Sequence, residues 1–543
     1  MTRVSIPALP AVWQFAKYCL TGVVNTAISY LIYAALIAVH WHPAAALVFG
    51  YTGGMISSYL LNARWTFQKT SFRWGQMWRF VLANGMILAL SELTLHWILY
   101  FILPSPYLAQ LVNLVPVTAF GFFVNKRFVF HERQMSLTSS SLASPSEAKG
   151  PEANGSQTRT AWKKLLAAAW ILFVVQRLIL LGSAWNAAFR DKQNWTAYQL
   201  LVHTYTHWDA GWYLEIAKGG YRTLEQTAFW PMYPWFIRFL HIGTGWNYEV
   251  SAVVISNSAF VATLFLLGIL ANLEFGLRPA LTAMAMLALF PTSFFFAADY
   301  TESQFLMFIL AAVLAARTKR FWLAGVCTLF ATLTRNTGIL VEFVLFLEYL
   351  RQGNMGWRFF KLSWWSKIRL NVVSMLLAPA GLALYMVWLK VHTGNLFAFV
   401  AAERFWHRSY MSPWLTWFHT LQLMFNHDAK MHTLGFYFPL EWGTMTLAVI
   451  WVALGVQHLR KSMTHVGWWL YLVATLWITS SEPSFNLPDY LVSFPRYALM
   501  LFPGFIYFAY LFRSKWLAIP WLLVSGYLLY FLGTLYFLRV WIA

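Results

Sequence analysis

Long apolar runs dominate this chain and recur along its whole length. Four runs come first, near residues 12–38, 44–63, 78–103 and 107–124. Each reaches or approaches the length of about 20 residues that a helix needs to cross a membrane. Roughly eleven more runs, several of them short, follow from Trp162 onward. The pattern predicts an all-α polytopic membrane protein, with a four-helix bundle followed by a larger bundle of about eleven transmembrane helices.

One polar segment, residues 134–160, separates the two sets of runs. It reads QMSLTSSSLASPSEAKGPEANGSQTRT and is rich in Ser, Ala, Gly and Pro, a composition typical of flexible linkers. We therefore expect three parts. These are a small membrane domain at 1–133, a cytoplasmic linker at 134–160 and a large membrane domain at 161–543.

Composition supports the membrane class and restricts the partners. Hydrophobic residues make up 59% of the chain and charged residues only 11%, whereas soluble proteins carry about 25% charged residues. A net charge of +20 would favour nucleic acid binding in a soluble protein. Here the Lys and Arg residues cluster in loops between apolar runs, where the positive-inside rule places them in the cytoplasm. We therefore expect membrane lipids as partners and no nucleic acid.

The first four runs contain an internal repeat. LNARWTF (61–67) and VNKRFVF (124–130) share the pattern Asn-x-Arg-aromatic-x-Phe and begin 63 residues apart. WQF (13–15) and WRF (78–80) also match, at an offset of 65 residues. Two hairpins of like orientation follow from these offsets, a pattern known in transporters. The alternative for the arginines is that they only extend from helix ends to the membrane interface.

Residues 10–130 resemble the GtrA-like family of four-span membrane proteins, on the motifs GVVNT (22–26), LNARWTF and VNKRFVF. The resemblance implies that this domain moves polyprenyl-phosphate-linked sugars across the membrane or assists their use. The candidate residues for a lipid-sugar site are Asn25, Asn62, Arg64, Glu92, Asn125 and Arg127. Hydrogen bonding between helices is the more ordinary role of a membrane asparagine. Glu92 is the stronger functional candidate because it is charged and lies within an apolar run.

In the large domain, charged residues gather in loops that the positive-inside rule places outside the cytoplasm. The long loop at 186–248 contains Asp209, and the next outward loop contains Glu302. Two later segments on the same side carry Arg335 and Arg496. Carboxylates and arginines among aromatic residues predict a polar cleft for an acidic, partly apolar substrate.

Four motifs of this domain, THWDAGWYLEIAKGGY, AFWPMYP, FPTSFFFAADYTESQF and LTRNTG, resemble the PIG-V-type mannosyltransferases of the GT-C class, over about Trp162 to Trp541. The resemblance implies transfer of a sugar, here mannose, from polyprenyl-phosphate-mannose to a glycan or lipid acceptor, with inversion. It assigns Asp209 as the catalytic carboxylate, and the positive-inside rule places this residue and the active site on the extracytoplasmic side of the cell membrane. It also implies that the reaction needs no metal and no cofactor beyond the donor.

The chemistry agrees with these roles. Transfer from a sugar phosphate needs a base for the acceptor hydroxyl, and Asp209 is the candidate. The alternative is that Asp209 only caps the helix that follows it. The candidates for binding the donor phosphate or sugar are His207, Trp208, Tyr300, Glu302, Arg335 and Arg496. The arginines would bind phosphate in bidentate fashion. Glu302 would contact sugar hydroxyls or pair with an arginine, and His207 would contact the phosphate or orient Asp209.

The two domains together predict a coupled protein, in which the first supplies lipid-linked sugar to the second. The competing hypothesis is a flippase for polyprenyl-phosphate-linked sugar that has no transferase activity. In that case Asp209 and the arginines would only bind the headgroup.

Overall fold

The computed structural model describes the second membrane domain almost completely and the first in part. The described residues are most of 17–35, 43–67, 76–87 and 117–130, then 151–355 apart from 193, 367–424, 437–485, 489–512 and 514–542. The chain divides into two compact units, Met1–Ala148 with Ile519–Val524 and Lys149–Ala518 with Ser525–Ala543.

In the first unit, the two copies of the repeated motif adopt the same backbone conformation. Helix α2 (Pro43–Leu61) continues into the π-helical turn η1 (Asn62–Thr66), and the second copy forms the matching turn η2 (Asn125–Val129). Each turn is closed by a hydrogen bond from a Phe amide to the Asn carbonyl, at 2.8 Å for Phe67 and 3.0 Å for Phe130. The two Phe rings stack with their centroids 4.5 Å apart. The sequence repeat is therefore also a structural repeat.

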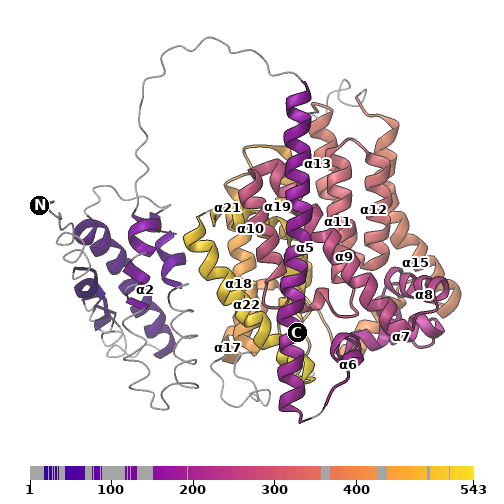
Figure 1. Cartoon of the computed structure of the whole chain (residues 1–543), viewed down its shortest axis with the longest axis horizontal. Helices are drawn as coiled ribbons and strands as arrows, with labels where there is room; N and C mark the ends of the chain where they lie inside the picture. The colour runs from indigo at the N-terminus through magenta and orange to yellow at the C-terminus, as the bar shows by residue number, and fades with distance from the viewer. Residues whose placement is uncertain are drawn as a thin grey trace, which may run out of the picture. The chain divides into compact units, whose positions relative to one another are not determined.

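The second unit is a helical bundle (Figure 1). Apart from helices, its described residues form short turns and isolated β-bridges that pair Ser484 with Arg408 and with Asp489. Its α-helices are α5 (Pro151–Arg190), α6 (Ala197–Leu201), α7 (Asp209–Gly219), α8 (Met232–Thr244), α9 (Tyr248–Phe275), α10 (Leu277–Ala288), α11 (Glu302–Arg317), α12 (Phe321–Thr334), α13 (Glu342–Gln352), α15 (Leu377–Thr393), α16 (Ala398–Ala402), α17 (Pro413–Met424), α18 (Tyr437–Val456), α19 (Met463–Thr479), α20 (Phe494–Tyr497), α21 (Phe502–Leu511) and α22 (Lys515–Phe537).

Helix α5 shows that the bundle is built for a lipid environment. Many of its large apolar side chains face outward, and Trp170, Ile171 and Leu178 are 53%, 62% and 62% exposed. Its polar Gln176 is buried and donates a hydrogen bond to the Ser293 carbonyl at 2.9 Å. A helix with an apolar outer face and a polar inner face is the arrangement expected in a bilayer, where polar side chains turn toward the bundle.

Five helical stretches among the described residues are long and apolar enough to span a membrane: Thr160–Arg190, Tyr248–Phe275, Leu370–Thr393, Tyr437–Val456 and Lys515–Phe537. The shorter helices α10, α12 and α21 are also apolar. The prediction of an all-α polytopic membrane protein is confirmed. Full-length spans are fewer than the predicted runs because turns interrupt several of them; for example, η6 (Asn336–Val341) separates α12 from α13.

The start of α5 differs from the end of the predicted linker. The helix begins at Pro151, so the last ten residues of the segment 134–160 are helical. Proline suits the first position of a helix because its missing amide hydrogen is not needed there. Residues 134–150 lie outside the described part of the chain.

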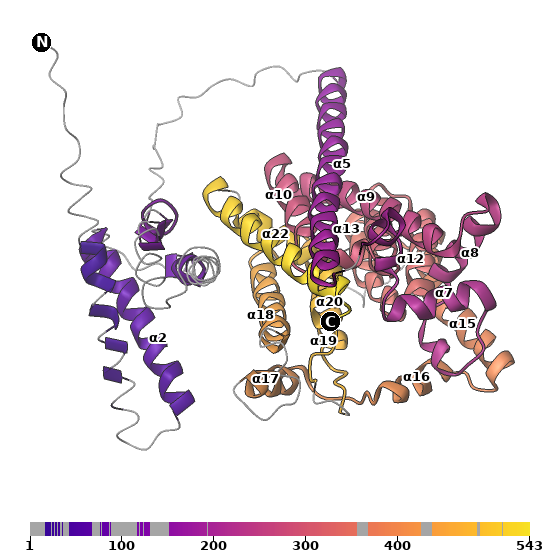
Figure 2. The same ribbon diagram turned by 60° about the horizontal axis from the view of Figure 1, so that its bottom comes forward.

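The short helices α6, α7 and α8 gather at the end of the bundle where α5 terminates (Figure 1). Figure 2 shows α7, α16 and α20 around the same end. The ring of Tyr213 in α7 packs edge-on against Tyr233 in α8, with centroids 5.4 Å apart. The Tyr385 hydroxyl of α15 donates to the Thr227 carbonyl at 2.8 Å. This end therefore joins segments that are far apart in sequence, and it holds the candidate site.

Candidate active site

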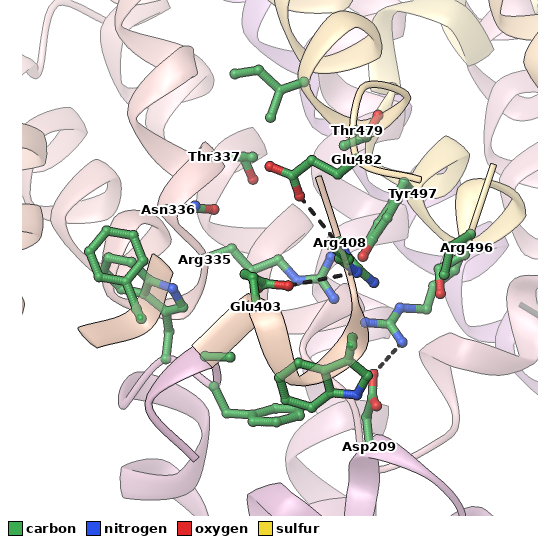
Figure 3. Close-up of a pocket in the computed structure, with 18 of the residues that line it drawn as sticks. Asp209, Arg335, Asn336, Thr337, Glu403, Arg408, Thr479, Glu482, Arg496 and Tyr497 are labelled. Carbon is green, nitrogen blue, oxygen red and sulfur yellow. Dashed lines mark hydrogen bonds and ion pairs between the residues drawn. The ribbon is translucent and has the colours of Figure 1, made fainter. Parts of the chain in front are cut away.

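A pocket of about 560 Å³ opens at this end of the second unit (Figure 3). Its volume falls within the range of roughly 300–1,000 Å³ that is usual for ligand sites. Aromatic side chains form much of its wall, among them Trp208, Phe229, Trp230, Trp406 and Tyr497. Its charged lining residues come from four separate segments of the chain: Asp209, Arg335, Glu403, Arg408, Glu482, Asp489 and Arg496.

Asp209 is the first residue of α7, and its carboxylate faces the pocket. Trp208 before it has a φ of 59°, a backbone conformation that costs a bulky residue about 1–3 kcal/mol. The Trp208 indole packs edge-on against Trp541, with ring centroids 5.0 Å apart. The Asp209 Oδ2 accepts a hydrogen bond from Arg496 Nη1 at 2.6 Å, and the side chain is 22% exposed. The turn thus aims Asp209 at an arginine from α20.

Arg496 belongs to a continuous chain of ion pairs. Its Nε lies 2.7 Å from the Glu302 Oε1, and Arg335 Nη2 donates to the same oxygen at 2.6 Å. Glu302 is fully buried, while the Arg335 and Arg496 side chains are 12% and 6% exposed. The order of contacts is therefore Asp209, Arg496, Glu302, Arg335. Two carboxylates and two guanidiniums balance in charge, which offsets much of the desolvation that burial imposes on each.

The motif FPTSFFFAADYTES supports this network from below the pocket surface. The Thr292 hydroxyl donates to the Pro495 carbonyl at 2.7 Å and so fixes the backbone next to Arg496. The Tyr300 ring lies 5.0 Å from the Arg496 guanidinium, and the Tyr300 hydroxyl donates to the His207 carbonyl at 3.0 Å. Thr301 accepts from Arg335 Nε at 2.7 Å. Thr292, Tyr300 and Thr301 each contact a residue of the pocket wall or the backbone beside it.

The motif LTRNTG is explained by a close backbone contact. Arg335 ends α12, and the chain turns directly into η6 with a hydrogen bond from the Gly338 amide to the Arg335 carbonyl at 2.9 Å. A Cβ atom on Gly338 would lie 2.5 Å from the Ala331 carbonyl carbon and 2.6 Å from the Thr332 nitrogen. Glycine is required because only its missing side chain allows the turn to pack against α12. The turn places Arg335 in the pocket wall.

Three predicted donor-site residues lie behind the wall instead of lining the pocket. Glu302 is enclosed by the two arginines, and Tyr300 lies beneath Arg496. Of the two roles expected for Glu302, the structure shows the ion pair. His207 packs its ring against Tyr536, with centroids 5.9 Å apart. Burial, and then the charge of Arg539, lower the pKa of His207 to about 4, so its imidazole is neutral at pH 7. Trp208, Arg335 and Arg496 do line the pocket.

The prediction from sequence did not include the group around Arg408. Its guanidinium lies in the pocket between Glu403 at 3.6 Å and Glu482 at 3.8 Å, beside Tyr497 (Figure 3). The sequence offered one signal for this group. Glu403, Arg404 and Arg408 form the larger of two charged groups in the outward loop 392–440, and Asp428 and Lys430 form the other. Among the described residues, no three His, Cys, Asp or Glu side chains gather as a metal site would require.

The predicted residues of the first unit are partly visible. Asn25 accepts from the Ser57 hydroxyl at 3.2 Å, and Asn125 donates to the Tyr18 hydroxyl at 3.1 Å. These bonds match the alternative role of linking helices. Asn62 is buried and Arg64 is exposed at the end of the π-helical turn. Glu92, the Arg127 side chain and the motif WQF lie outside the described residues.

Comparison with known proteins gives two family matches. Residues 17–130 match the family described as GtrA/DPMS, transmembrane domain, and residues 185–390 match the family described as Mannosyltransferase (PIG-V). The uncharacterized membrane protein YngA of Bacillus subtilis is 29% identical over 110 residues, which cover 20% of this chain and 71% of that protein.

A solved structure also shows similarity. The oligosaccharyltransferase of Archaeoglobus fulgidus, crystallised as a complex with Zn and sulfate, superposes with a TM-score of 0.34 and 13% identity. The superposition covers 68% of this chain and 53% of that one, so this chain spans about half the length of that enzyme. The two family matches lie in different parts of the chain: the similarity to the GtrA/DPMS transmembrane domain falls in the first unit, and the similarity to the PIG-V mannosyltransferases falls in the second.

Proposed function

We propose that this protein is a membrane glycosyltransferase that transfers mannose from polyprenyl-phosphate-mannose to an extracytoplasmic acceptor. The observation that carries the proposal is the pocket itself. It combines a carboxylate at Asp209 with arginines at 335 and 496, and aromatic side chains surround these charges. A base, a set of cations for a phosphate and apolar surface for a lipid or sugar are what this reaction requires.

Asp209 acts as the general base in this proposal. Arg496 holds one carboxylate oxygen at 2.6 Å, so the other oxygen is available to the acceptor. The acceptor hydroxyl gives its proton to Asp209 while its oxygen bonds to the anomeric carbon of the sugar. The bond from that carbon to the phosphate oxygen breaks, and polyprenyl phosphate leaves with the electron pair. A single displacement inverts the anomeric carbon, and the phosphate leaves as a stable anion without a general acid.

The arginines stabilise the phosphate as its negative charge develops. Guanidinium groups suit this role because they stay charged and bind phosphate in bidentate fashion. Glu302 and Tyr300 are positioning residues, since both hold Arg496 from behind the pocket wall. Arginine charge takes the place that a metal ion has in many phosphate-transfer sites, so the reaction proceeds without a divalent cation.

The site faces the extracytoplasmic side in this proposal. Arg317 is the last residue of α11 and Lys319 and Arg320 follow it, whereas Glu302 at the start of the helix adjoins the pocket. The positive-inside rule assigns the end with the basic cluster to the cytoplasm. The first unit then moves or recruits the lipid-linked sugar for the second, at an effective concentration raised by the tether to the order of mM.

The test is the substitution Asp209→Asn in the purified full-length protein. It keeps a hydrogen-bonding side chain of the same size but removes the base, so transfer of mannose should fall by about 10²–10⁴-fold. Mass spectrometry of reactions with polyprenyl-phosphate-mannose and a panel of glycan and lipid acceptors measures the transfer. Asp191→Asn, at an exposed position in the turn after α5, is the matched control. Undiminished transfer by the Asp209→Asn variant would refute the role of Asp209 as the general base.

The same assay separates the transferase from a flippase. A flippase without transferase activity forms no glycosylated product with any acceptor, while it still moves labelled lipid between leaflets of a vesicle. Deleting residues 1–132 then tests the first unit. A translocating unit is needed only when the donor is confined to the inner leaflet, whereas a stabilising unit affects the yield of protein but not activity per molecule.

A further inference from the structure

Three arginines meet at a single tyrosine in the pocket. The guanidinium carbons of Arg335 and Arg496 each lie 5.5 Å from the centre of the Tyr497 ring. Tyr497 also lies beside the Arg408 side chain, which enters from a different loop (Figure 3). The three guanidiniums would repel one another without the nearby carboxylates, so an anion that binds here must replace one or more of those carboxylates.

The three arginines differ in how tightly carboxylates hold them. Arg335 and Arg496 have carboxylate partners at 2.6–2.7 Å. Arg408 has its two carboxylates at 3.6 and 3.8 Å, beyond hydrogen-bond distance. Its Nε is buried and makes no hydrogen bond to the described residues. Arg408 is thus the guanidinium of the cluster whose donors are most available to a ligand.

The partners of Arg408 are also the easiest to exchange. Glu403 and Glu482 are 37% and 50% exposed, so either carboxylate can turn to water when its partner is taken. Glu302, by contrast, is fully buried and cannot lose both of its arginines without a large desolvation cost. A ligand that competes for arginine would therefore displace the carboxylates from Arg408 first.

Arg408 lies on a fixed part of the pocket wall. The Met411 amide donates to the Ser481 carbonyl at 2.9 Å, and the Phe485 amide donates to the His407 carbonyl at 3.3 Å. The Ser484 hydroxyl adds a bond to the Trp406 carbonyl at 3.0 Å. These bonds join the loop that carries Arg408 to the loop that carries Glu482. The two loops therefore hold the Arg408 backbone in place at the pocket wall.

We propose that Arg408, together with the Tyr497 hydroxyl, binds the phosphate of the lipid-linked sugar donor by exchanging Glu403 and Glu482 for phosphate oxygens. The inference rests on the proposed function and assigns the direct phosphate ligand within it. Arg335 and Arg496 then supply charge from the wall while they remain bound to Glu302. Arg496 contacts both Tyr497 and Asp209, and Arg408 lines the same pocket, so the phosphate site and the base share one cavity.

Binding of a short-chain polyprenyl phosphate to the purified full-length protein tests the proposal, with the matching polyprenol as the probe that lacks phosphate. Arg408→Gln should weaken the binding of polyprenyl phosphate by at least about tenfold and leave polyprenol binding unchanged. Arg404→Gln is the matched control, because Arg404 is exposed on the same loop and lies outside the pocket lining. Wild-type affinity of the Arg408→Gln variant for polyprenyl phosphate would overturn the proposal.

A second variant covers the case in which Arg408→Gln fails to fold. Arg408→Lys keeps the charge but loses the bidentate fork, so it should still weaken polyprenyl phosphate binding severalfold. Unchanged affinity in this variant, when Arg408→Gln is not folded, would also overturn the proposal.

Kinetics distinguish the donor phosphate from a phosphate carried by an acceptor lipid. In Arg408→Lys, KM for the donor should rise while KM for the acceptor stays the same, and the reverse result contradicts the assignment. Asp209→Asn separates this inference from the proposed function, since it should retain affinity for polyprenyl phosphate although transfer is lost. Intact transfer in Asp209→Asn would refute the role of Asp209 as general base but would leave the assignment of Arg408 as phosphate ligand unaffected.

Discussion

Helix α11 carries a network of charges at each of its ends, and the two networks differ in how completely the protein satisfies them. At the start of the helix, Glu302 shares its Oε1 between Arg335 and Arg496, while its Oε2 has no hydrogen-bond partner among the described residues. At the other end, Arg317 pairs with Glu274 and Glu348.

The network at the far end is closed by protein groups. Glu348 is 1% exposed and accepts bonds from Arg351 at 2.5 and 3.0 Å, from Gln352 at 2.6 Å and from Thr464 at 2.9 Å. Arg317 donates to Thr464 at 3.1 Å. Every oxygen of Glu348 therefore has partners, and the contacts join α11, α13 and α19. This is the behaviour of a buried structural network.

The network at the start of α11 borders a cavity. Arg335, Arg496 and Asp209 all line the pocket, and Arg408 adds a third guanidinium with distant partners. The comparison shows that buried Arg and Glu residues alone do not mark a site. What distinguishes the pocket network is that its charged side chains line a cavity, and that one of its arginines, Arg408, has no carboxylate within hydrogen-bond distance.

The largest expected difference between the two networks comes from removing one arginine from each. Arg496→Ala leaves Asp209 without its partner, so transfer per folded molecule should fall by about 10²–10³-fold. Arg317→Ala should destabilise the fold by about 3–5 kcal/mol, because it leaves Glu274 and Glu348 uncompensated, yet it should keep transfer per folded molecule within about twofold. Denaturant titration and transfer assays on the same samples measure both quantities. Equal losses of specific activity in the two variants would contradict the assignment of a catalytic role to one network and a structural role to the other.

Substituting the central carboxylate of each network, Glu302 or Glu348, tests the same comparison with smaller expected effects. Glu302→Gln removes the charge that holds Arg335 and Arg496, so transfer should fall by about tenfold. Glu348→Gln removes as many charged contacts but should lower only the free energy of unfolding, by about 1–3 kcal/mol. A fall in kcat for Glu348→Gln, with the fold intact, would show that the far network also serves the reaction.

The pH dependence of stability tests the burial of His207 behind the pocket. Its pKa is lowered to about 4 in the folded protein, mainly by burial, from about 6.5 in the unfolded chain. Below pH 6.5 the unfolded chain binds the proton and the folded protein does not, so stability is full above pH 6.5 and is lost as the pH falls toward 4. After allowance for partial exposure, the loss is roughly 1–2 kcal/mol. His207→Asn should flatten this part of the curve in denaturant titrations, and an unchanged slope would place His207 in water.

The smallest expected effect is that of a chelator. If arginines provide the positive charge at the phosphate, treatment with EDTA should change the rate of transfer by less than about twofold. Added Mg²⁺ or Mn²⁺ should have an equally small effect. A loss of transfer on chelation that is restored by one of these ions would contradict the arginine-only site.

The sequence predicted the membrane class, both domains and several residues that meet in the pocket. Apolar runs and the positive-inside rule placed Asp209, Arg335 and Arg496 on one side, and the structure brings these three into one pocket. Such features are readable because hydropathy and charge act locally along the chain.

Other features depend on contacts that no local pattern encodes. Glu302 lies beneath Arg335 and Arg496, which are distant from it in the sequence. Arg408 reaches the pocket only because its loop pairs with residues 481–485. The helical start of α5 was missed for a different reason. The prediction relied on the Ser- and Gly-rich composition of residues 134–160 and gave no weight to Pro151 as the first residue of a helix.

The most direct test of the central claim is a density map of the full-length Asp209→Asn variant with bound polyprenyl-phosphate-mannose. We predict that the mannose lies in the pocket with its anomeric carbon within about 3–5 Å of the side chain at position 209, and that the phosphate contacts arginine. A glycolipid bound elsewhere, with position 209 facing no sugar, would contradict the assignment of this pocket as the active site.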